Sequence, residues 1–251
     1  MDEEMLLKRH VLDLAKKAWQ QNVYLYTNFL SMAELDLVYR MGRELNFIRW
    51  ETFGGNPSCE RQMVGFGSEE EMGYPGEFPI VLLEIMPMAE KFAESLTHRD
   101  YLGALLNLGI QRSLLGDIVV RDKKAYVYCV DTIAPFIQEN LTKVKHTYMS
   151  ARPVSLELED VRPVLAPMKL NVASERLDVI VAAISGCSRN QVLELFRTKK
   201  IFVNGKINEN NSATLKAGDV LSIRGTGKFI YEGVQAETRK GRYSVLLQKY
   251  C

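Results

Sequence analysis

The feature that most constrains the fold of this chain is a dense series of motifs between residues 174 and 231. Its first apolar residues recur at spacings of three and four, as on one face of a helix: Leu177, Ile180, Val181 and Ile184. Arg176 and Asp178 flank that face and are expected to project away from it. The pattern predicts a small helical module close to the C-terminal end.

A second helix is predicted directly after the first. Ser188 is a favourable N-cap, and the residues expected to be buried follow it: Val192, Leu193, Leu195 and Phe196. Arg189 falls in the first turn, where a cation opposes the helix dipole, so helix stability does not account for its position. After the strand-like residues 201–203, Asn204-Gly205 predicts a two-residue hairpin, because both positions favour positive φ.

Charge is distributed unevenly along the chain. Residues 166–251 hold fourteen Lys and Arg against seven Asp and Glu, a net charge of about +7, whereas residues 1–165 hold eighteen against twenty-four, about −6. The formal net charge of +1 for all 251 residues conceals this polarity. A concentrated basic module is typical of nucleic-acid binding. The alternative is a solvated basic surface that has no partner.

These motifs together resemble the small alpha-L RNA-binding module, the S4-like domain of ribosomal, tRNA-synthetase and pseudouridine-synthase proteins. The matching positions are Arg-Leu-Asp at 176–178, Ser-Arg at 188–189, Val-Asn-Gly-Lys at 203–206 and Gly-Asp at 218–219. The resemblance implies that the two-helix face and the hairpin bind structured RNA. The RNA-binding residues carried over by these motifs are Arg176, Ser188, Arg189, Gln191, Lys199, Lys200, Asn204 and Lys206.

The first 75 residues predict an N-terminal α/β domain. Its expected elements are two helices and a pair of strands, at residues 4–22, 31–45, 46–50 and 62–66. Ser31 with Glu34 three residues later is typical of a capping box. Between the strands lie Phe53-Gly54-Gly55 and Glu60-Arg61, which fit either a phosphate-binding loop or a plain tight turn.

A different order of elements follows and predicts a ferredoxin-like (RRM-like) central domain. The expected order is β-α-β-β-α-β, at residues 78–86, 99–108, 116–120, 125–130, 132–141 and 143–149. Tyr126 and Tyr128 alternate onto one strand face, where they either stack RNA bases or pack within the fold. The chain is therefore predicted to be an α+β multidomain protein, with domains at 1–75, 76–165 and 166–251.

The sequence contains no constellation that is typical of an enzyme or a metal site. His10, His98 and His146 are far apart, and neither a nucleophile elbow nor a zinc-binding motif accompanies them. We therefore expect no catalytic residues, no metal and no cofactor. The alternative is an RNA-modifying enzyme of the pseudouridine-synthase type that uses the S4-like domain as an anchor. Asp117 and Asp131 are its candidate catalytic residues.

Cysteine usage and hydropathy favour a cytoplasmic protein without a membrane span. The wide spacing of the cysteines favours free thiols over a disulfide framework: they are Cys59, Cys129, Cys187 and Cys251. No run approaches the roughly 20 apolar residues of a membrane span, and the acidic start 1–4 lacks the form of a signal peptide. A monomer is expected, since no feature of the sequence demands a dimer.

Nearly the whole sequence, and not only its C-terminal part, resembles the YlmH family of bacterial proteins. The resemblance rests on Phe53-Gly54-Gly55 with Glu60-Arg61, on the segment 98–106, on Leu108-Gly109-Ile110 and on Leu115-Gly116-Asp117-Ile118. It implies binding of rRNA and tRNA on the large ribosomal subunit in the rescue of stalled translation, with a link to cell division. A further alternative is a septal adaptor that contacts division proteins through residues 1–165.

Overall fold

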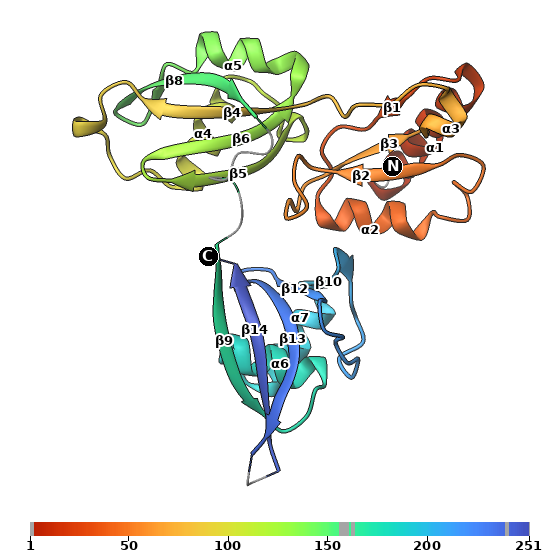
Figure 1. Ribbon diagram of the computed structural model, residues 1–251, viewed down its shortest axis with the longest axis vertical. Coiled ribbons are helices and arrows are strands. Elements are labelled where there is room, and N and C mark those ends of the chain that lie inside the picture. The colour runs from red at the N-terminus through yellow and green to blue at the C-terminus, as the bar shows by residue number, and fades with distance from the viewer. Residues whose placement is uncertain (1–2, 156–160, 162–163, 239–240, 251) are drawn as a thin grey trace. The chain divides into compact units, whose positions relative to one another are not determined.

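The computed structural model of the protein describes residues 3–155, 161, 164–238 and 241–250, and it divides into two compact units, Met1–Arg162 and Pro163–Cys251. Figure 1 shows that helices and sheets occur together in both units. Within the described residues, the first unit holds a three-stranded and a five-stranded sheet, and the second holds a six-stranded sheet. The expected division of the first unit near residue 75 stays a prediction.

The N-terminal part of the first unit packs helices against a small antiparallel sheet. Its elements are α1 (Glu3–Gln21), β1 (Leu25–Tyr26), α2 (Met32–Arg40), β2 (Trp50–Phe53), β3 (Met63–Phe66) and α3 (Glu69–Met72), with the strand order β1-β3-β2. α1 buries Val11, Ala15 and Ala18, which are spaced as one face of an amphipathic helix. The capping box is confirmed, because Ser31 N donates to the Glu34 carboxylate over 2.6 Å and Glu34 N donates to Ser31 Oγ.

The strand expected at residues 46–50 was wrong. α2 ends at Arg40, turns follow, and β2 begins only at Trp50. Phe47 and Ile48 pack in the core beside α1 and α2, so their hydrophobicity reflects burial within a turn rather than strand alternation. β1 was not predicted, since two residues are too few to show a period of two.

The central part of the first unit has the predicted ferredoxin-like order. Its elements are β4 (Ile80–Pro87), α4 (His98–Asn107), β5 (Leu115–Arg121), β6 (Lys124–Val130), α5 (Ala134–Asn140), β7 (Lys143–Val144) and β8 (Thr147–Val154), with 3₁₀ turns at Glu90–Phe92, Arg112–Leu114 and Asp131–Ile133. In the sheet order β5-β6-β4-β8-β7, the first and third long strands lie side by side at the centre. This antiparallel arrangement confirms the ferredoxin-like class.

The last strand of this sheet was expected at residues 143–149 but lies later. Residues 143–144 form only the edge strand β7, which pairs with the start of β8. Lys145 adopts a positive φ of 50° in the turn between them. A lysine at that position carries no turn signal in the sequence, which explains the error.

The two faces of the central sheet have different neighbours. α4 and α5 cover one face, and strand and helix residues form a single core there: Leu83, Ile85, Val127, Tyr101, Leu105 and Ile137. The opposite face packs in part against the N-terminal segments through a second core: Phe29, Met63, Leu82, Tyr126 and Tyr128. The N-terminal and central parts therefore share a core within the first unit.

The second unit consists of two helices on an antiparallel sheet. Its elements are β9 (Leu165–Val172), α6 (Leu177–Ser185), α7 (Arg189–Arg197), β10 (Ile201–Val203), β11 (Lys206–Ile207), β12 (Val220–Ile223), β13 (Gly227–Glu237) and β14 (Tyr243–Tyr250). The strand order is β11-β10-β12-β13-β14-β9. β14 pairs with β9 from Tyr243 opposite Val172 to Tyr250 opposite Leu165. The predicted α+β class is thus confirmed in both units.

The thiols and hydropathy of the described residues fit the sequence expectations. Within the described residues, Cys59, Cys129 and Cys187 carry thiols rather than disulfides, and Cys251 lies outside these residues. Burial raises the pKa of the Cys129 thiol to about 12, which makes it a structural side chain. In the described part of the chain, helices are too short or too polar to cross a membrane. The His, Cys, Asp and Glu residues placed by the structure form no group that could hold a metal.

Candidate nucleic-acid interface

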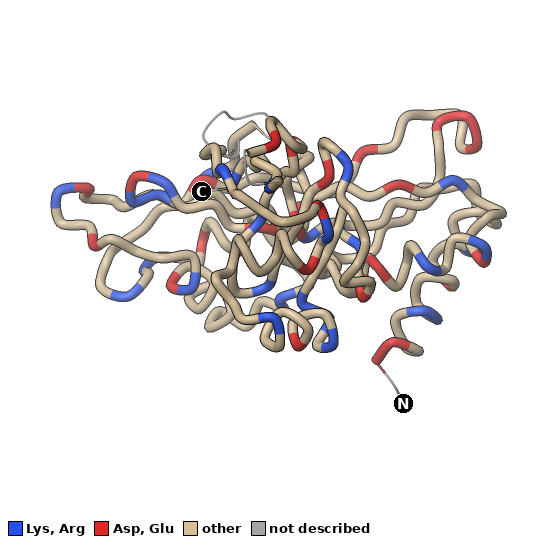
Figure 2. Tube along the Cα trace, turned by 90° about the horizontal axis from the view of Figure 1, so that it is seen from below, with Lys and Arg blue, Asp and Glu red and all other residues tan. Residues whose placement is uncertain are grey.

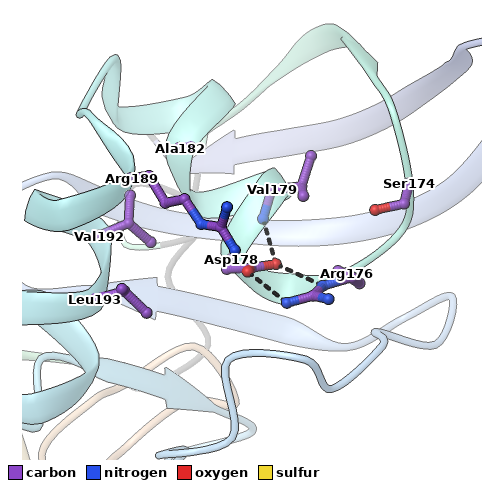
Figure 3. Close-up of a pocket in the computed structure, with 8 residues that line it drawn as sticks. All are labelled: Ser174, Arg176, Asp178, Val179, Ala182, Arg189, Val192 and Leu193. Carbon is purple, nitrogen blue, oxygen red and sulfur yellow. Dashed lines mark hydrogen bonds and ion pairs between the residues drawn. The ribbon is translucent and has the colours of Figure 1, made fainter.

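The start of α6 fixes Arg176 at the surface. The N–H groups of Leu177 and Asp178 donate to the carbonyls of Ala213 and Asn211, so the loop before β12 closes over the start of the helix. Arg176 Nε and Nη2 donate to the two carboxylate oxygens of Asp178 over 3.1 and 2.7 Å (Figure 3). This pairing raises the pKa of Arg176 above its ordinary value. It uses two of the five guanidinium donors and holds the plane of the group.

The start of α7 is closed by a complete capping box. Ser188 N donates to Gln191 Oε1 over 2.8 Å, and Gln191 N donates to Ser188 Oγ over 3.5 Å. The N-cap prediction for Ser188 is confirmed. The structural part of Gln191 was missed, although the Ser-x-x-Gln spacing is a signal for it. Both side chains therefore cap the N-terminus of α7, and the RNA contacts expected of them stay predictions.

A surface pocket brings the two arginines together. It has a volume of about 410 Å³ and lies between α6 and α7, with Arg176 and Arg189 in its lining. Figure 3 shows that the guanidinium groups of Arg176 and Arg189 both lie near the Asp178 carboxylate. Leu193 also lines the pocket and is 40% exposed, so its expected burial was wrong. Val192 and Phe196 are buried as expected.

The Asn-Gly hairpin has the predicted geometry, and hydrogen bonds hold the side chain of its asparagine in place. Asn204 and Gly205 have φ values of +51° and +76°, as a type I′ turn requires. Asn204 Nδ2 donates to Asp219 Oδ1 over 2.8 Å, and Asn204 Oδ1 accepts from Val220 N over 2.9 Å. The Asn-Gly and Gly-Asp motifs are thus one hydrogen-bonded structure. The RNA contact expected of Asn204 stays a prediction.

The predicted lysines lie outside the pocket lining, on the turn after α7 and at the start of β11. Lys199 follows α7 with a φ of +54°, and its Nζ lies 3.7 Å from the Glu209 carboxylate. Lys200 and Lys206 are exposed. The backbone N–H of Arg224 donates to the Lys200 carbonyl over 2.9 Å, and the Arg224 guanidinium lies 5.4 Å from the centre of the Phe202 ring.

The loop between β2 and β3 does not offer its amides to a phosphate. Glu60 N and Arg61 N donate to the Asp117 carboxylate over 2.6 and 3.2 Å. The Arg61 guanidinium donates to the carbonyls of Leu115 and Phe29 over 3.0 and 2.8 Å. For Glu60 and Arg61 the phosphate-binding alternative was therefore wrong, because a carboxylate of the same chain occupies their backbone N–H donors. This set of bonds is called the Asp117 clasp below.

Tyr126 and Tyr128 are packed rather than available to bases. Their exposures are 2% and 0%. Tyr128 Oη accepts from Asn56 Nδ2 over 2.6 Å, and Tyr126 Oη lies 3.4 Å from Glu84 Oε1 as its donor. Burial raises the pKa of Tyr128 to about 12. Of the two alternatives for this pair, packing within the fold is the correct one.

Comparison with known proteins finds two domain families in the chain. A family model for the RNA-binding domain in YlmH matches residues 74–158, and the S4 domain model matches residues 175–221. Ribosome-associated protein quality control protein P2 of Bacillus subtilis is 30% identical over 197 residues, which cover 78% of this chain and 76% of that protein. The chain belongs to the YlmH family.

A solved structure bears the same family name. Cell division protein ylmH from Streptococcus pneumoniae is 25% identical, with a TM-score of 0.49, and the match covers 61% of this chain and 92% of that one. The YlmH RNA-binding match contains the whole ferredoxin-like sheet, and the S4 match runs from just before α6 into β12. Both Arg176 and Arg189 lie within the S4 domain. The YlmH chain therefore carries two domains of RNA-binding type.

Proposed function

We propose that this chain is a non-enzymatic RNA-binding factor of the cytoplasm that acts as a monomer. It docks on structured RNA of the large ribosomal subunit, rRNA together with tRNA, in the rescue of stalled translation. The observation that carries the proposal is the convergence of Arg176 and Arg189 from two helices on one surface pocket. The Arg176 guanidinium, which Asp178 holds in place, suits phosphate oxygens, which arginine binds through parallel N–H donors, and Arg189 adds a second cation to the same pocket.

The ribosomal setting is supported by a relative. The Bacillus subtilis protein that shares 30% identity bears the name of a ribosome-associated quality control protein. Phosphate contacts position a protein on RNA without reading sequence, which suits recognition of a folded rRNA shape. A link to cell division is proposed as an indirect consequence of the role on the ribosome.

The septal-adaptor alternative is tested by removing residues 166–251. A protein that acts as an adaptor through residues 1–165 would still reach the septum after this truncation.

A non-enzymatic role is supported by the way in which the candidate aspartates are used. The Asp117 carboxylate accepts two backbone N–H groups in the clasp. Asp131 begins a 3₁₀ turn, and its N–H donates to the Pro79 carbonyl over 3.0 Å. The test is nucleoside analysis of RNA incubated with the protein, with chemical derivatisation because pseudouridine and uridine have equal mass. A modified nucleoside that disappears with Asp117→Asn or Asp131→Asn would contradict the proposal.

The experiment that tests the docking role is co-sedimentation with purified ribosomal subunits, either empty or carrying peptidyl-tRNA. The wild type is compared with an Arg176→Glu, Arg189→Glu double variant. A matched control, Lys16→Glu with Lys17→Glu, makes the same charge change on the exposed face of α1. We expect the wild type and the control to sediment with the large subunit and the double variant to remain in the supernatant.

Each outcome of this experiment has a definite meaning. Stronger sedimentation in the presence of peptidyl-tRNA supports the stalled-translation setting. Equal sedimentation of the double variant and the wild type would overturn the pocket lined by Arg176 and Arg189, called the S4 pocket below, as the docking site. Equal losses in the double variant and the α1 control would show that net charge alone, rather than the pocket, drives binding.

A further inference from the structure

The face of the central sheet opposite the helices is covered only over part of its area. At one end Leu82 and Tyr128 pack against the N-terminal segments. Tyr148 lies on the same face. Residues four apart on a strand point to the same side, so Tyr148 shares a face with Arg152, which is the cross-strand partner of Glu84 in β4. Its ring is 63% exposed. We call the exposed residues Lys124, Lys143, Tyr148 and Arg152 the β8 platform.

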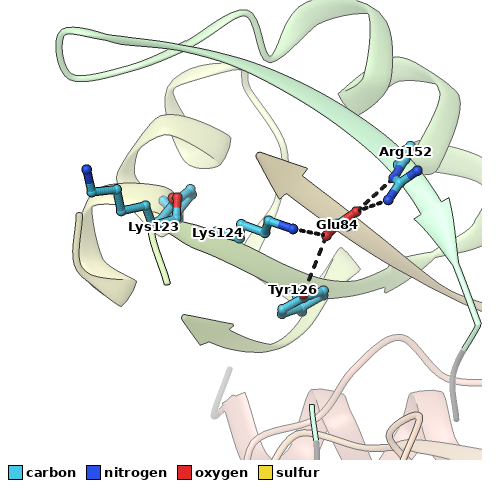
Figure 4. A network of polar contacts seen from close by, with 6 residues as sticks. Glu84, Lys123, Lys124, Tyr126 and Arg152 are labelled. Carbon is cyan, nitrogen blue, oxygen red and sulfur yellow. Dashed lines mark hydrogen bonds and ion pairs between the residues drawn. The ribbon is translucent and has the colours of Figure 1, made fainter. Parts of the chain in front are cut away.

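Glu84 organises two cations of the β8 platform. This carboxylate is 4% exposed. It accepts from Lys124 Nζ over 3.0 Å and from Arg152 Nε over 2.7 Å, as Figure 4 shows. The Lys124 and Arg152 side chains are 38% and 64% exposed. A buried anion thus holds two cations at the surface in defined positions, and both keep further N–H donors.

The exposed aromatic ring has a cation of its own. Lys143 is the cross-strand partner of Tyr148, and its Nζ lies 5.2 Å from the centre of the ring. Lys143 also lines a pocket of about 550 Å³ between α4 and the α5–β7 loop, together with Arg99, Asn107, Asn140 and Lys145. Asp100 lines it too and pairs with Lys145 over 2.8 Å. The cations of the platform therefore continue into a polar pocket.

This concentration of cations runs against the charge of its surroundings. The first 165 residues carry a net charge of about −6. In Figure 2, the loops at the left-hand end carry Lys and Arg together with Asp and Glu. Cations gathered beside an exposed ring, within the acidic part of a chain whose total net charge is +1, indicate a binding site for an anion that also carries planar groups.

We propose that the β8 platform binds an unpaired RNA segment, with a base stacked on Tyr148 and phosphates held by Lys143, Lys124 and Arg152. This inference rests on the proposed RNA-binding function and adds a second contact on a separate unit. Grooves that combine cations with stacking rings are the usual design for single-stranded nucleic acid. The central strand positions Tyr126 and Tyr128 are buried, so the stacking ring lies towards the sheet edge instead.

The test is fluorescence anisotropy of a labelled eight-nucleotide oligouridylate with the full chain. The background is Arg176→Glu with Arg189→Glu, which removes the S4 pocket from the measurement. We expect Tyr148→Ala to weaken binding by roughly 5- to 100-fold, the loss of one stacked base. Tyr148→Phe keeps the ring and should stay within about twofold of the background. The matched control is Phe136→Ala, a ring on α5 that is 44% exposed.

The inference is overturned if Tyr148→Ala binds as tightly as Phe136→Ala, or if the background protein does not bind the oligonucleotide. It is also overturned if a glutamate-rich peptide of equal charge competes as well as the RNA, since an acidic protein would then be the better ligand. These outcomes leave the S4 docking role standing. A failure of that role appears instead in the co-sedimentation of the Arg176 and Arg189 variant.

Discussion

At the scale of single residues, the most consequential pairing is that of Arg176 with Asp178. The sequence places both residues beside the apolar face of α6, but it does not show that they bind each other. The structure adds a bidentate contact over 3.1 and 2.7 Å, and Asp178 also accepts from Val179 N over 2.9 Å. An acidic residue is thereby part of the proposed phosphate site, where it holds the Arg176 guanidinium in place.

The first prediction follows from that role. Asp178→Asn makes the pocket more positive, so simple electrostatics would tighten RNA binding. We expect the opposite, a loss of about three- to tenfold, because Arg176 loses the charge-assisted contact that orders it. The control is Glu194→Gln, which makes the same charge change on α7, where the Glu194 carboxylate pairs with the exposed Arg197 over 2.8 Å. The affinity for a folded rRNA fragment checks both, and tighter binding by Asp178→Asn would refute the ordering role.

A second residue-scale prediction concerns Glu84. Burial alone would raise the pKa of this carboxyl, but hydrogen bonds from Arg152 and Lys124 outweigh it and hold the pKa below its usual value. Its stabilising contribution is therefore present above the unfolded pKa of roughly 4.3 and is lost as the pH falls through the lower folded value. Hydrogen exchange in β4 and β6 should show Glu84→Gln less protected than the wild type at pH 7. The difference should shrink towards pH 3, and a constant difference would contradict the ionised pair.

At the scale of elements, the residues of the family motifs in the first unit form contacts between segments that are distant in sequence. Gly55 has a φ of +107°, and a Cβ there would overlap the Tyr128 ring. Gly116 likewise lies against Phe29 and Tyr128. With the Asp117 clasp, these positions join the β2–β3 loop to the central sheet. Their glycines and charges were visible in the sequence, but the partner of each was fixed only by tertiary packing.

The third prediction tests this junction. We expect Gly55→Ala to lower the free energy of unfolding by at least about 3 kcal/mol, because the added methyl group clashes with a ring and the backbone there is already strained. Gly73→Ala is the control: it also has a positive φ, of 79°, but in the described part of the chain its Cβ would meet open space. Its cost should be about 1 kcal/mol. The protection of β6 amides from hydrogen exchange measures the loss in free energy of unfolding for each variant. Equal losses would contradict the packing of Gly55 against Tyr128 as the cause.

At the scale of the whole molecule, the parts that were predictable from sequence are those with a local signal. The helices α1 and α4 to α7, the Asn204-Gly205 turn and the ferredoxin-like order follow from periodicity and turn chemistry, and they are confirmed. α2 ends five residues before the predicted end at residue 45, and the short α3 was not predicted. The burial of Tyr126, the exposure of Leu193 and the Glu84 pairs depend on segments distant in sequence, as in the register of Glu84 with Arg152. Strand alternation showed which residues share a face, whereas the neighbours of that face came from the fold.

The central proposal for the whole molecule is that the S4 pocket neutralises phosphates of a folded RNA. The most direct test is the affinity for a folded rRNA fragment as a function of salt concentration. If about four phosphates are neutralised, the wild type should show a log–log slope of about −3 to −4. Arg176→Glu with Arg189→Glu should bind more weakly, with a slope less steep by about 1.5 or more. A wild-type slope near zero, or one that the double variant leaves unchanged, would contradict the claim.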